Sequence, residues 1–278
     1  MPWKYTDEYY QEYTRTTWNA AAEPYLGFMS RLLPLHKELV SHLGPQKGES
    51  ILDMASGPGE PAMTIAHLVG RQGKVMGVDL SEKMVELAIR SAKEKGMDNL
   101  DFRVMNCEKL ELPAGSFDAV VSAFGFQIFT DPEKAARESY RVVRDGGRFA
   151  CCIWSTGDRV PYLHAIIGPM LAHAEPDETG YIPTPYEIGG DGEMVRFLEQ
   201  TGFKDAAEVR VEQEFRFRDA EEYLDVILRG TPIGHSLSEE TAEVQHEVIE
   251  STRANLAKWT QSGGIAIPGE CVFVTARK

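Results

Sequence analysis

ILDMASGPGEP, residues 51–61, is the segment that decides the fold class of this 278-residue chain. Its first residues form a short apolar run that predicts a buried strand, and Pro61 opens a predicted helix. Gly57 and Gly59 lie between the two, where a Cβ would block both the tight turn and the close approach of a ligand. Backbone N–H groups at a helix start are free to bind that ligand. A plain turn without a ligand is the alternative.

A second segment, KVMGVDLSEKM (residues 74–84), ends its apolar run at Asp79. A carboxylate at the end of the second strand is the expected acceptor for both hydroxyl groups of a ribose. Capping of the next helix is the alternative role for Asp79, but Ser81 is already placed for that role. The glycine loop and Asp79 together predict a nucleoside site.

Two nucleoside cofactors compete for this site. GPGEPA, residues 57–62, fits the GxGxxA fingerprint of dinucleotide-binding loops. Asp53, however, precedes the glycines and would repel a pyrophosphate. S-adenosyl-L-methionine has no phosphate and carries an ammonium and a sulfonium, which suit Asp53 directly or through water. The acid therefore favours S-adenosyl-L-methionine over NAD.

Strand-like runs alternate with amphipathic helices between residues 50 and 154, the region that contains both of these segments. The strand-like runs are SILDM, KVMGVD, LDFRVM, FDAVVSA and GRFACCIW. One of the intervening helices has Asp131 as its cap, Pro132 at its first position and Gly146 as its end. This alternation predicts an α/β fold: a Rossmann-like, seven-stranded, mostly parallel sheet with helices on both faces.

The flanking regions divide the chain further. Residues 1–45 are predicted to form a helical lead-in or lid, broken by Pro34 and ended by Gly44. Residues 46–154 form the cofactor-binding core, and residues 155–190 are predicted to form a substrate cap. Residues 191–278 complete the sheet around a helical insertion. Two strands in this last region predict an antiparallel hairpin at one edge.

Composition excludes several classes of protein. With 29 basic and 43 acidic residues, the net charge of −14 disfavours nucleic acid as a partner. Four cysteines form no disulfide framework and no zinc motif, so no metal is expected. The N-terminus lacks the apolar core of a signal peptide, and no stretch reaches the length of a membrane span. These features predict a cytoplasmic protein.

In their order and spacing, LDMASGPG, VMGVDLSEKMVELA, VMNCEKLELPAGSFDAVVSAFGFQ and DPEKAARESYRVVRDGGRF resemble the motifs of class I S-adenosylmethionine-dependent methyltransferases. Residues 48–154 are most similar to the type 11 branch that includes the ubiquinone and menaquinone biosynthesis methyltransferases. Relatives usually have glycine and a small residue at Ala55 and Ser56, and often an aspartate at Asn106. The resemblance implies cofactor contacts from Asp53, Ala55, Ser56, Gly57, Gly59, Asp79, Leu80, Met84, Asn106, Cys107, Ser122 and Ala123, with Tyr25 folding over the cofactor.

The same resemblance implies in-line methyl transfer to a small-molecule acceptor, with S-adenosyl-L-homocysteine as the product. Alignment of the acceptor atom with the methyl group and the sulfur supplies most of the rate enhancement. A base is needed only if the acceptor carries a proton. Ligands bind beyond the carboxyl ends of parallel strands, which places Phe124 and the 155–190 cap near the acceptor and predicts acceptor contacts from Phe126, Gln127, Trp154 and His164. Packing is the alternative role for Phe126 and Trp154.

His164 and then His235 are the candidate bases, with surface or packing roles as their alternatives. The C-terminal helices offer an apolar face that either roofs the pocket or binds a second subunit in a homodimer. An NAD-dependent oxidoreductase and a cofactor-binding scaffold without catalytic activity remain as alternative functions.

Overall fold

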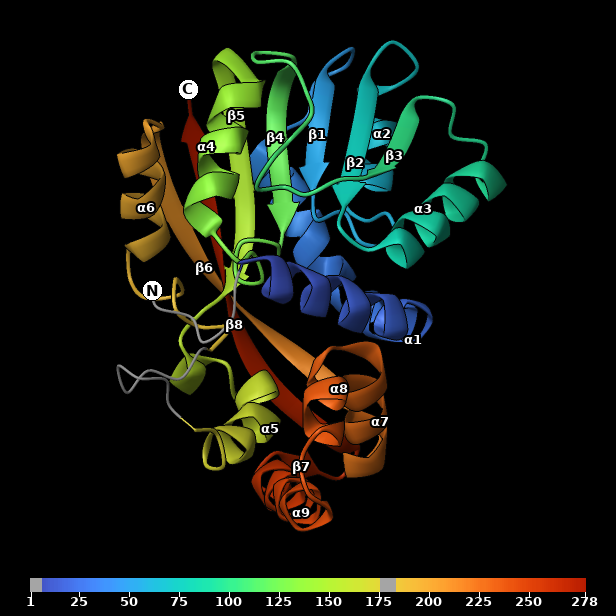
Figure 1. Ribbon diagram of the computed structural model, residues 1–278, viewed down its shortest axis with the longest axis vertical. Helices are drawn as coiled ribbons and strands as arrows, with labels where there is room; N and C mark the ends of the chain where they lie inside the picture. Colours follow the sequence, from blue (N-terminus) through green and yellow to red (C-terminus); the bar gives the residue numbers. More distant parts are fainter. Residues whose placement is uncertain (1–6, 176–183) are drawn as a thin grey trace.

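The computed structural model describes residues 7–175 and 184–278, and its centre is one mixed sheet (Figure 1). The strand order is β3-β2-β1-β4-β5-β8-β6, and the short β7 pairs with β8 outside this path. The strands are β1 (Ser50–Met54), β2 (Lys74–Asp79), β3 (Leu100–Val104), β4 (Phe117–Ala123), β5 (Val143–Trp154), β6 (Lys204–Phe217), β7 (Thr260–Gln261) and β8 (Gly264–Arg277).

The direction of the strands brings the glycine loop and Asp79 to the same edge of the sheet. β1 is parallel to β2 and β4, β2 is parallel to β3, and β4 is parallel to β5. β8 runs antiparallel to both β5 and β6, with the helical insertion between β6 and β8. The predicted mostly parallel sheet with an antiparallel hairpin at one edge is therefore confirmed.

Helices cover both faces of the sheet, as the alternation of strand and helix predicts. The helices are α1 (Asp7–Leu43), α2 (Ala62–Val69), α3 (Glu82–Glu94), α4 (Pro132–Val142), α5 (Pro161–Leu171), α6 (Glu193–Thr201), α7 (Ala220–Gly230), α8 (Ile233–Ser238) and α9 (Ala242–Ala257), with a 3-10 turn at Gly157–Arg159. Successive strand residues alternate between faces. Ile51 therefore packs in the cluster under α1 and α2, while Leu52 packs in the cluster under α4 and α6.

α1 is one continuous helix, so the predicted break at Pro34 is wrong. Proline removes a backbone donor inside a helix and costs about 3 kcal/mol. The buried side chains Leu32, Leu35 and Leu39 hold both sides of Pro34 against the main core, and their packing outweighs this cost. The helix ends at Gly44 as predicted, where φ is +62° and the Gly44 N–H donates to the Val40 carbonyl at 3.0 Å.

The boundaries of α4 are confirmed at one end and corrected at the other. Asp131 caps the helix by accepting from the Lys134 N–H at 2.9 Å, and Pro132 occupies the first helical position. The helix ends at Val142 and not at Gly146, because the backbone from Val143 already pairs with β4. Tertiary pairing with the sheet thus ends this helix before its glycine.

Helices α5, α7, α8 and α9 lie beyond the carboxyl ends of the parallel strands. α5 packs against α9, and α7 packs against α1 and α8, below the sheet in the view of Figure 1. The predicted cap at residues 155–190 contains α5, and residues 176–183 of it lie outside the described residues. Within residues 7–175 and 184–278, no helix combines the length and the apolar character needed to cross a bilayer.

Candidate functional site

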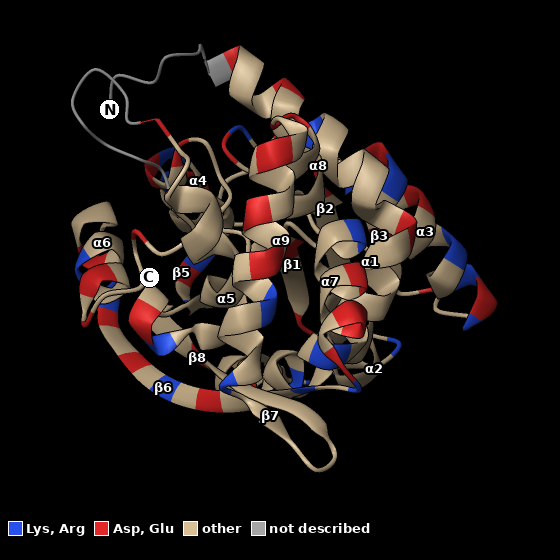
Figure 2. Cartoon of the chain, turned by 90° about the horizontal axis from the view of Figure 1, so that it is seen from below, with Lys and Arg blue, Asp and Glu red and all other residues tan. Residues whose placement is uncertain are grey.

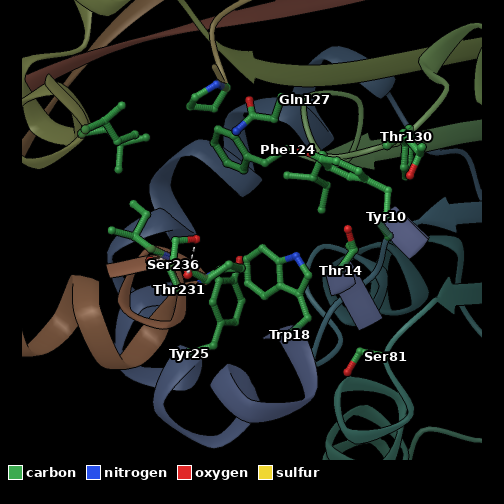
Figure 3. A pocket seen from close by; sticks show the side chains of 18 of the residues that line it. Tyr10, Thr14, Trp18, Tyr25, Ser81, Phe124, Gln127, Thr130, Thr231 and Ser236 are labelled. Carbon is green, nitrogen blue, oxygen red and sulfur yellow. Dashed lines mark hydrogen bonds between the residues drawn. The ribbon is translucent and has the colours of Figure 1, made fainter. Parts of the chain in front are cut away.

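A cavity of about 570 Å³ lies between the carboxyl ends of the parallel strands, the first half of α1 and the helices α5, α8 and α9 (Figure 3). Cavities that bind small molecules typically have volumes of 300 to 1,000 Å³. The two ends of the cavity differ in character. One end is formed by the glycine loop and Asp79, and the other is walled mainly by aliphatic and aromatic side chains.

The glycine loop turns sharply because several of its residues adopt left-handed backbone conformations. φ is +57° at Ala55, +52° at Gly57 and +118° at Gly59. Ala55 and Gly57 line the cavity. Gly59 lies behind them, where an added Cβ would come within 2.4 Å of Met63 Cε. Its N–H donates to the Ser56 carbonyl at 3.1 Å and closes the turn.

Asp79 connects this loop to the start of α3. Its Oδ2 accepts from the Gly57 N–H at 2.8 Å, and its Oδ1 accepts from the Ser81 N–H at 2.9 Å. Ser81 Oγ caps α3 by accepting from the Met84 N–H, as predicted. A carboxylate has about four lone-pair positions, so Asp79 keeps acceptor capacity towards the cavity that it lines. Burial raises the pKa of Asp79, although these backbone N–H groups oppose the rise.

This raised pKa predicts a pH dependence of cofactor binding. The ribose contact predicted for Asp79 uses both oxygens of the ionised carboxylate, and protonation of Asp79 would turn one of these acceptors into a donor. We expect affinity for S-adenosylhomocysteine to fall as the pH decreases through the Asp79 pKa, by up to about tenfold per pH unit below it. Calorimetric titrations between pH 5 and pH 8 measure this. Asp53 also has a raised pKa, so Asp79→Asn is the control: an equally steep pH dependence in that variant would contradict the assignment.

The neighbouring wall brings together several more of the side chains predicted to contact the cofactor. Leu80, Met84, Asn106 and Cys107 all line the cavity, and Ala123 lines it from the end of β4. Asn106 Oδ1 already accepts from the Glu108 N–H at 2.8 Å, which orients the amide. Burial raises the pKa of the Cys107 thiol, so it stays protonated and does not act as a nucleophile.

Four of the predicted cofactor residues lie behind the cavity wall: Asp53, Ser56, Gly59 and Ser122. Asp53 is fully buried, and its Oδ2 accepts from the Ala62 N–H at the start of α2 at 3.0 Å. Ser122 Oγ donates to the Met54 carbonyl at 2.9 Å. The expectation that they line the cavity is corrected: Asp53 and Ser122 lie on the central strands β1 and β4, whose side chains are enclosed, and Ser56 and Gly59 lie on the buried side of the glycine loop.

After β4, the Phe124 side chain lines the cavity and the Phe126 side chain does not. Phe126 is 1% exposed and packs against Phe129 and Phe149 in the cluster under α4, so its predicted substrate contact is wrong. Phe124 has a left-handed backbone, with φ at +59°, and its ring stacks on Trp154 with centroids 4.7 Å apart. Trp154 and Gln127 line the cavity, as predicted.

Neither candidate base lies in the cavity lining. His164 is on the exposed side of α5, and its ring lies 6.1 Å from that of Tyr186. Leu163 and Ile167 occupy the side of α5 that faces the cavity. His235 packs beside Tyr13, with ring centroids 5.6 Å apart. The expectation that His164 or His235 acts on the acceptor is therefore corrected.

α1 contributes a wall of the cavity that the sequence analysis did not predict beyond Tyr25. Tyr10, Thr14 and Trp18 line the cavity together with Tyr25, as Figure 3 shows. Their spacing of i, i+4 and i+8 places the first three on one helix face, which is the signal that could have identified them. α8, which adjoins α1 through the Tyr13–Ser236 contact, and α9 form a further wall through residues such as Ser236 and Val244. The C-terminal helices thus roof the pocket, and a homodimer stays a prediction.

Comparison with known proteins identifies the family. The model of the ubiE/COQ5 methyltransferase family matches residues 31–166. The chain is 30% identical over 173 residues to the ubiquinone/menaquinone biosynthesis C-methyltransferase UbiE of Edwardsiella ictaluri, covering 58% of this chain and 68% of that protein. The chain belongs to the ubiE/COQ5 methyltransferase family.

Further similarities extend beyond this match. The methyltransferase is 27% identical over 178 residues to a demethylmenaquinone methyltransferase of Listeria monocytogenes, covering 60% of this chain and 75% of that protein. Its fold is similar to that of the YcgJ protein of Bacillus subtilis, with a TM-score of 0.63 and 18% identity, over 87% of this chain and 97% of the other. The protein is thus an enzyme that uses S-adenosylmethionine for methyl transfer, and the comparisons do not support an NAD-dependent oxidoreductase.

Proposed function

We propose that the methyltransferase transfers the methyl group of S-adenosylmethionine to a small, uncharged and largely apolar molecule. This molecule binds at the end of the cavity away from the Asp79 loop. The observation that carries this proposal is the continuity of one cavity from the Asp79 loop to an apolar chamber. In this arrangement Asp79 holds the ribose, and Leu80 and Met84 flank the adenine. The methionine tail then lies along Ala55 and Gly57.

The acceptor chamber is the part of the cavity beyond Tyr25, and apolar side chains dominate it. Its walls come from α1, the ends of β4 and β5, and the helices α5, α8 and α9, through Phe28, Leu32, Phe124, Ile128, Trp154, Leu163, Ile167, Met170, Ile233, Leu237, Val244 and Val248. Burying apolar surface contributes about 25 cal/mol per Å². The chamber therefore favours an acceptor with a flat or aliphatic apolar body, and a quinone-like ring, as in the names of the relatives, would meet this description.

The charges of the lining argue against an anionic acceptor. Among the described lining residues, Arg15 carries the only guanidinium or ammonium, and it is hydrogen-bonded to Glu12 and Glu82. Glu108, Glu175 and Glu240 line the same cavity. Acidic residues also recur along α9 (Figure 2). The lining histidine, His173, lies 3.4 Å from Glu247. A phosphate or carboxylate on the acceptor would therefore meet repulsion, and both basic side chains of the described lining already lie beside carboxylates.

The chemistry at this site depends on alignment. The sulfonium of the cofactor is already activated, so the nucleophilic atom of the acceptor displaces it in line and takes the methyl group. The sulfur keeps the bonding pair and leaves as the neutral thioether of S-adenosylhomocysteine. Any proton lost by the acceptor passes to water. Holding the reacting atoms about 3 to 3.5 Å apart supplies most of the rate enhancement.

Two measurements test this proposal. Calorimetric titration of the purified protein should give binding of S-adenosylmethionine and S-adenosylhomocysteine, and none of NAD. Incubation with methyl-labelled S-adenosylmethionine and a panel of neutral aromatic compounds and phosphorylated amines should then label only neutral compounds. Labelling confined to phosphorylated amines would overturn the proposed acceptor class. Absence of binding of both S-adenosyl compounds would overturn the cofactor arrangement.

A substitution in α9 should separate the acceptor chamber from the cofactor site. Val244 is half-buried and lines the chamber. Tryptophan at this position would occupy space that the acceptor needs, so Val244→Trp should reduce methyl transfer at least about tenfold. Overpacking typically costs about 1 to 3 kcal/mol of stability, and affinity for S-adenosylhomocysteine should stay within about twofold.

Val209→Trp is the matched control for this variant, because Val209 is 48% exposed on β6 and does not line the cavity. It should retain the wild-type rate of label transfer. Equal activity of the two variants would mean that the acceptor binds elsewhere.

A further inference from the structure

Gln127 is held in one orientation by the backbone of β5. Its Oε1 accepts a hydrogen bond from the Trp154 N–H at 2.8 Å. A backbone N–H can only donate, so the amide oxygen must face Trp154 and the amide nitrogen must face the other way. Gln127 lines the cavity beside Phe124, on the wall opposite Trp18 and Tyr25 (Figure 3). Its Nε2 makes no hydrogen bond within the part of the chain that the structure describes.

The apolar surroundings of this amide favour a hydrogen bond from its free N–H groups to a bound ligand. Phe124 and Trp154 stack on each other next to it, so the donors emerge from an aromatic wall. In an apolar setting a hydrogen bond is stronger than in water, and an unpaired polar group is costly. A hydrocarbon that excluded water from this end of the cavity would leave the N–H groups unpaired, whereas an acceptor that supplied an oxygen would pair them.

Two hydroxyl groups in the cavity lining, those of Thr231 and Ser236, are already hydrogen-bonded within the protein. Thr231 Oγ1 donates to the Ile227 carbonyl at 2.7 Å. Ser236 Oγ lies 2.9 Å from the Tyr13 hydroxyl, where either oxygen can donate. Gln127 differs from both because its binding to the protein uses only its oxygen and leaves its donors towards the cavity.

We propose that the Gln127 amide donates a hydrogen bond to an oxygen of the methyl acceptor, and so selects oxygen-bearing ring compounds over hydrocarbons of the same shape. The bond also fixes the ring relative to the methyl group, so Gln127 determines specificity and position. The amide stays neutral, and no proton leaves it. This inference rests on the proposed function, because it requires the acceptor to occupy the chamber.

The test uses two compounds of matched shape, 1-tetralone and tetralin, which differ in one carbonyl oxygen. Each is titrated into the wild-type protein saturated with S-adenosylhomocysteine. A single hydrogen bond made in a desolvated site should favour 1-tetralone about tenfold. Equal affinity for the two compounds, or no binding of either, would overturn the inference. Failure of S-adenosylhomocysteine itself to bind would instead overturn the proposed function, so the two failures are distinguishable.

Two variants attribute the preference to the amide. Gln127→Glu keeps an oxygen for the Trp154 N–H but replaces the cavity-facing donor with an acceptor. Gln127→Met removes the donor at similar length. Both should lose the preference at pH 8, and acidification should restore part of it in Gln127→Glu alone, because the protonated carboxyl can donate. Gln213→Glu, on β6 outside the cavity, should keep the wild-type preference. An undiminished preference in both Gln127 variants would overturn the assignment.

Discussion

Asp79→Ala is expected to lower the affinity for S-adenosylhomocysteine by about a hundredfold or more while the fold survives. Hydrogen bonds to a charged group contribute about 1.5 to 3 kcal/mol each, and the proposed ribose site makes two of them. The substitution also frees the Gly57 N–H and the Ser81 N–H, whose acceptors are the Asp79 carboxylate oxygens. Loosening of the glycine loop should add to the loss. Calorimetric titration measures the dissociation constant, and circular dichroism checks the fold.

Two control variants distinguish the specific role of the Asp79 carboxylate from the effect of losing any one negative charge. Asp101 lies exposed on β3 and pairs with Arg103, so Asp101→Ala removes an equal charge away from the cavity and should leave affinity unchanged. Asp79→Asn keeps the shape and one acceptor oxygen, and should fall between the wild type and Asp79→Ala. Wild-type affinity in Asp79→Ala would show that the ribose binds elsewhere.

Gly59→Ala is expected to destabilise the protein by about 3 kcal/mol. φ at Gly59 is +118°, a conformation that strains any residue with a Cβ by about 1 to 3 kcal/mol. An added Cβ would also lie 2.4 Å from Met63 Cε, 3.3 Å from Phe102 Cζ and 3.5 Å from Ala88 Cβ. Met63 is flexible and can move, but the other two contacts hold the new methyl group in place. Urea denaturation measures the change in the free energy of unfolding.

Gly70→Ala is the matched control for strain without crowding. Gly70 ends α2 with φ at +70°, and an added Cβ there meets nothing within 4 Å. Because φ is positive and ψ is −176°, this backbone favours glycine, and the substitution should cost about 1 to 2 kcal/mol through strain alone. A cost at Gly59 no larger than that at Gly70 would mean that the glycine loop rearranges easily, contrary to its packing in this structure.

Prediction from sequence succeeded where the interactions are local. The cap of α3 by Ser81 and the cap of α4 by Asp131 each join residues three apart, so the pattern of residue types suffices to predict them. The alternation of short apolar runs with amphipathic helices likewise predicted the parallel core. Asp79 was predicted to follow the second strand, and the structure places it at the cavity edge next to the glycine loop.

Prediction failed where one local preference competes with distant packing. Pro34 predicts a break in a helix, but contacts of α1 with the sheet keep the helix continuous. Phe126 follows the same strand end as Phe124, and no local pattern shows which ring faces the cavity. Phe124 has a left-handed backbone, its N–H donates to the Cys152 carbonyl, and its ring stacks on Trp154, a residue 30 positions away in the sequence.

The sequence alone determined the fold class, the family resemblance and the nucleoside character predicted for the site, because each depends on short local patterns and on their order along residues 48–154. Only the tertiary structure decided the shape of the acceptor chamber, the exclusion of His164 and His235 from its lining, and the orientation of the Gln127 amide. The chamber is formed by segments from both ends of the chain, which meet only after the sheet has formed and α1 and α9 have packed around it.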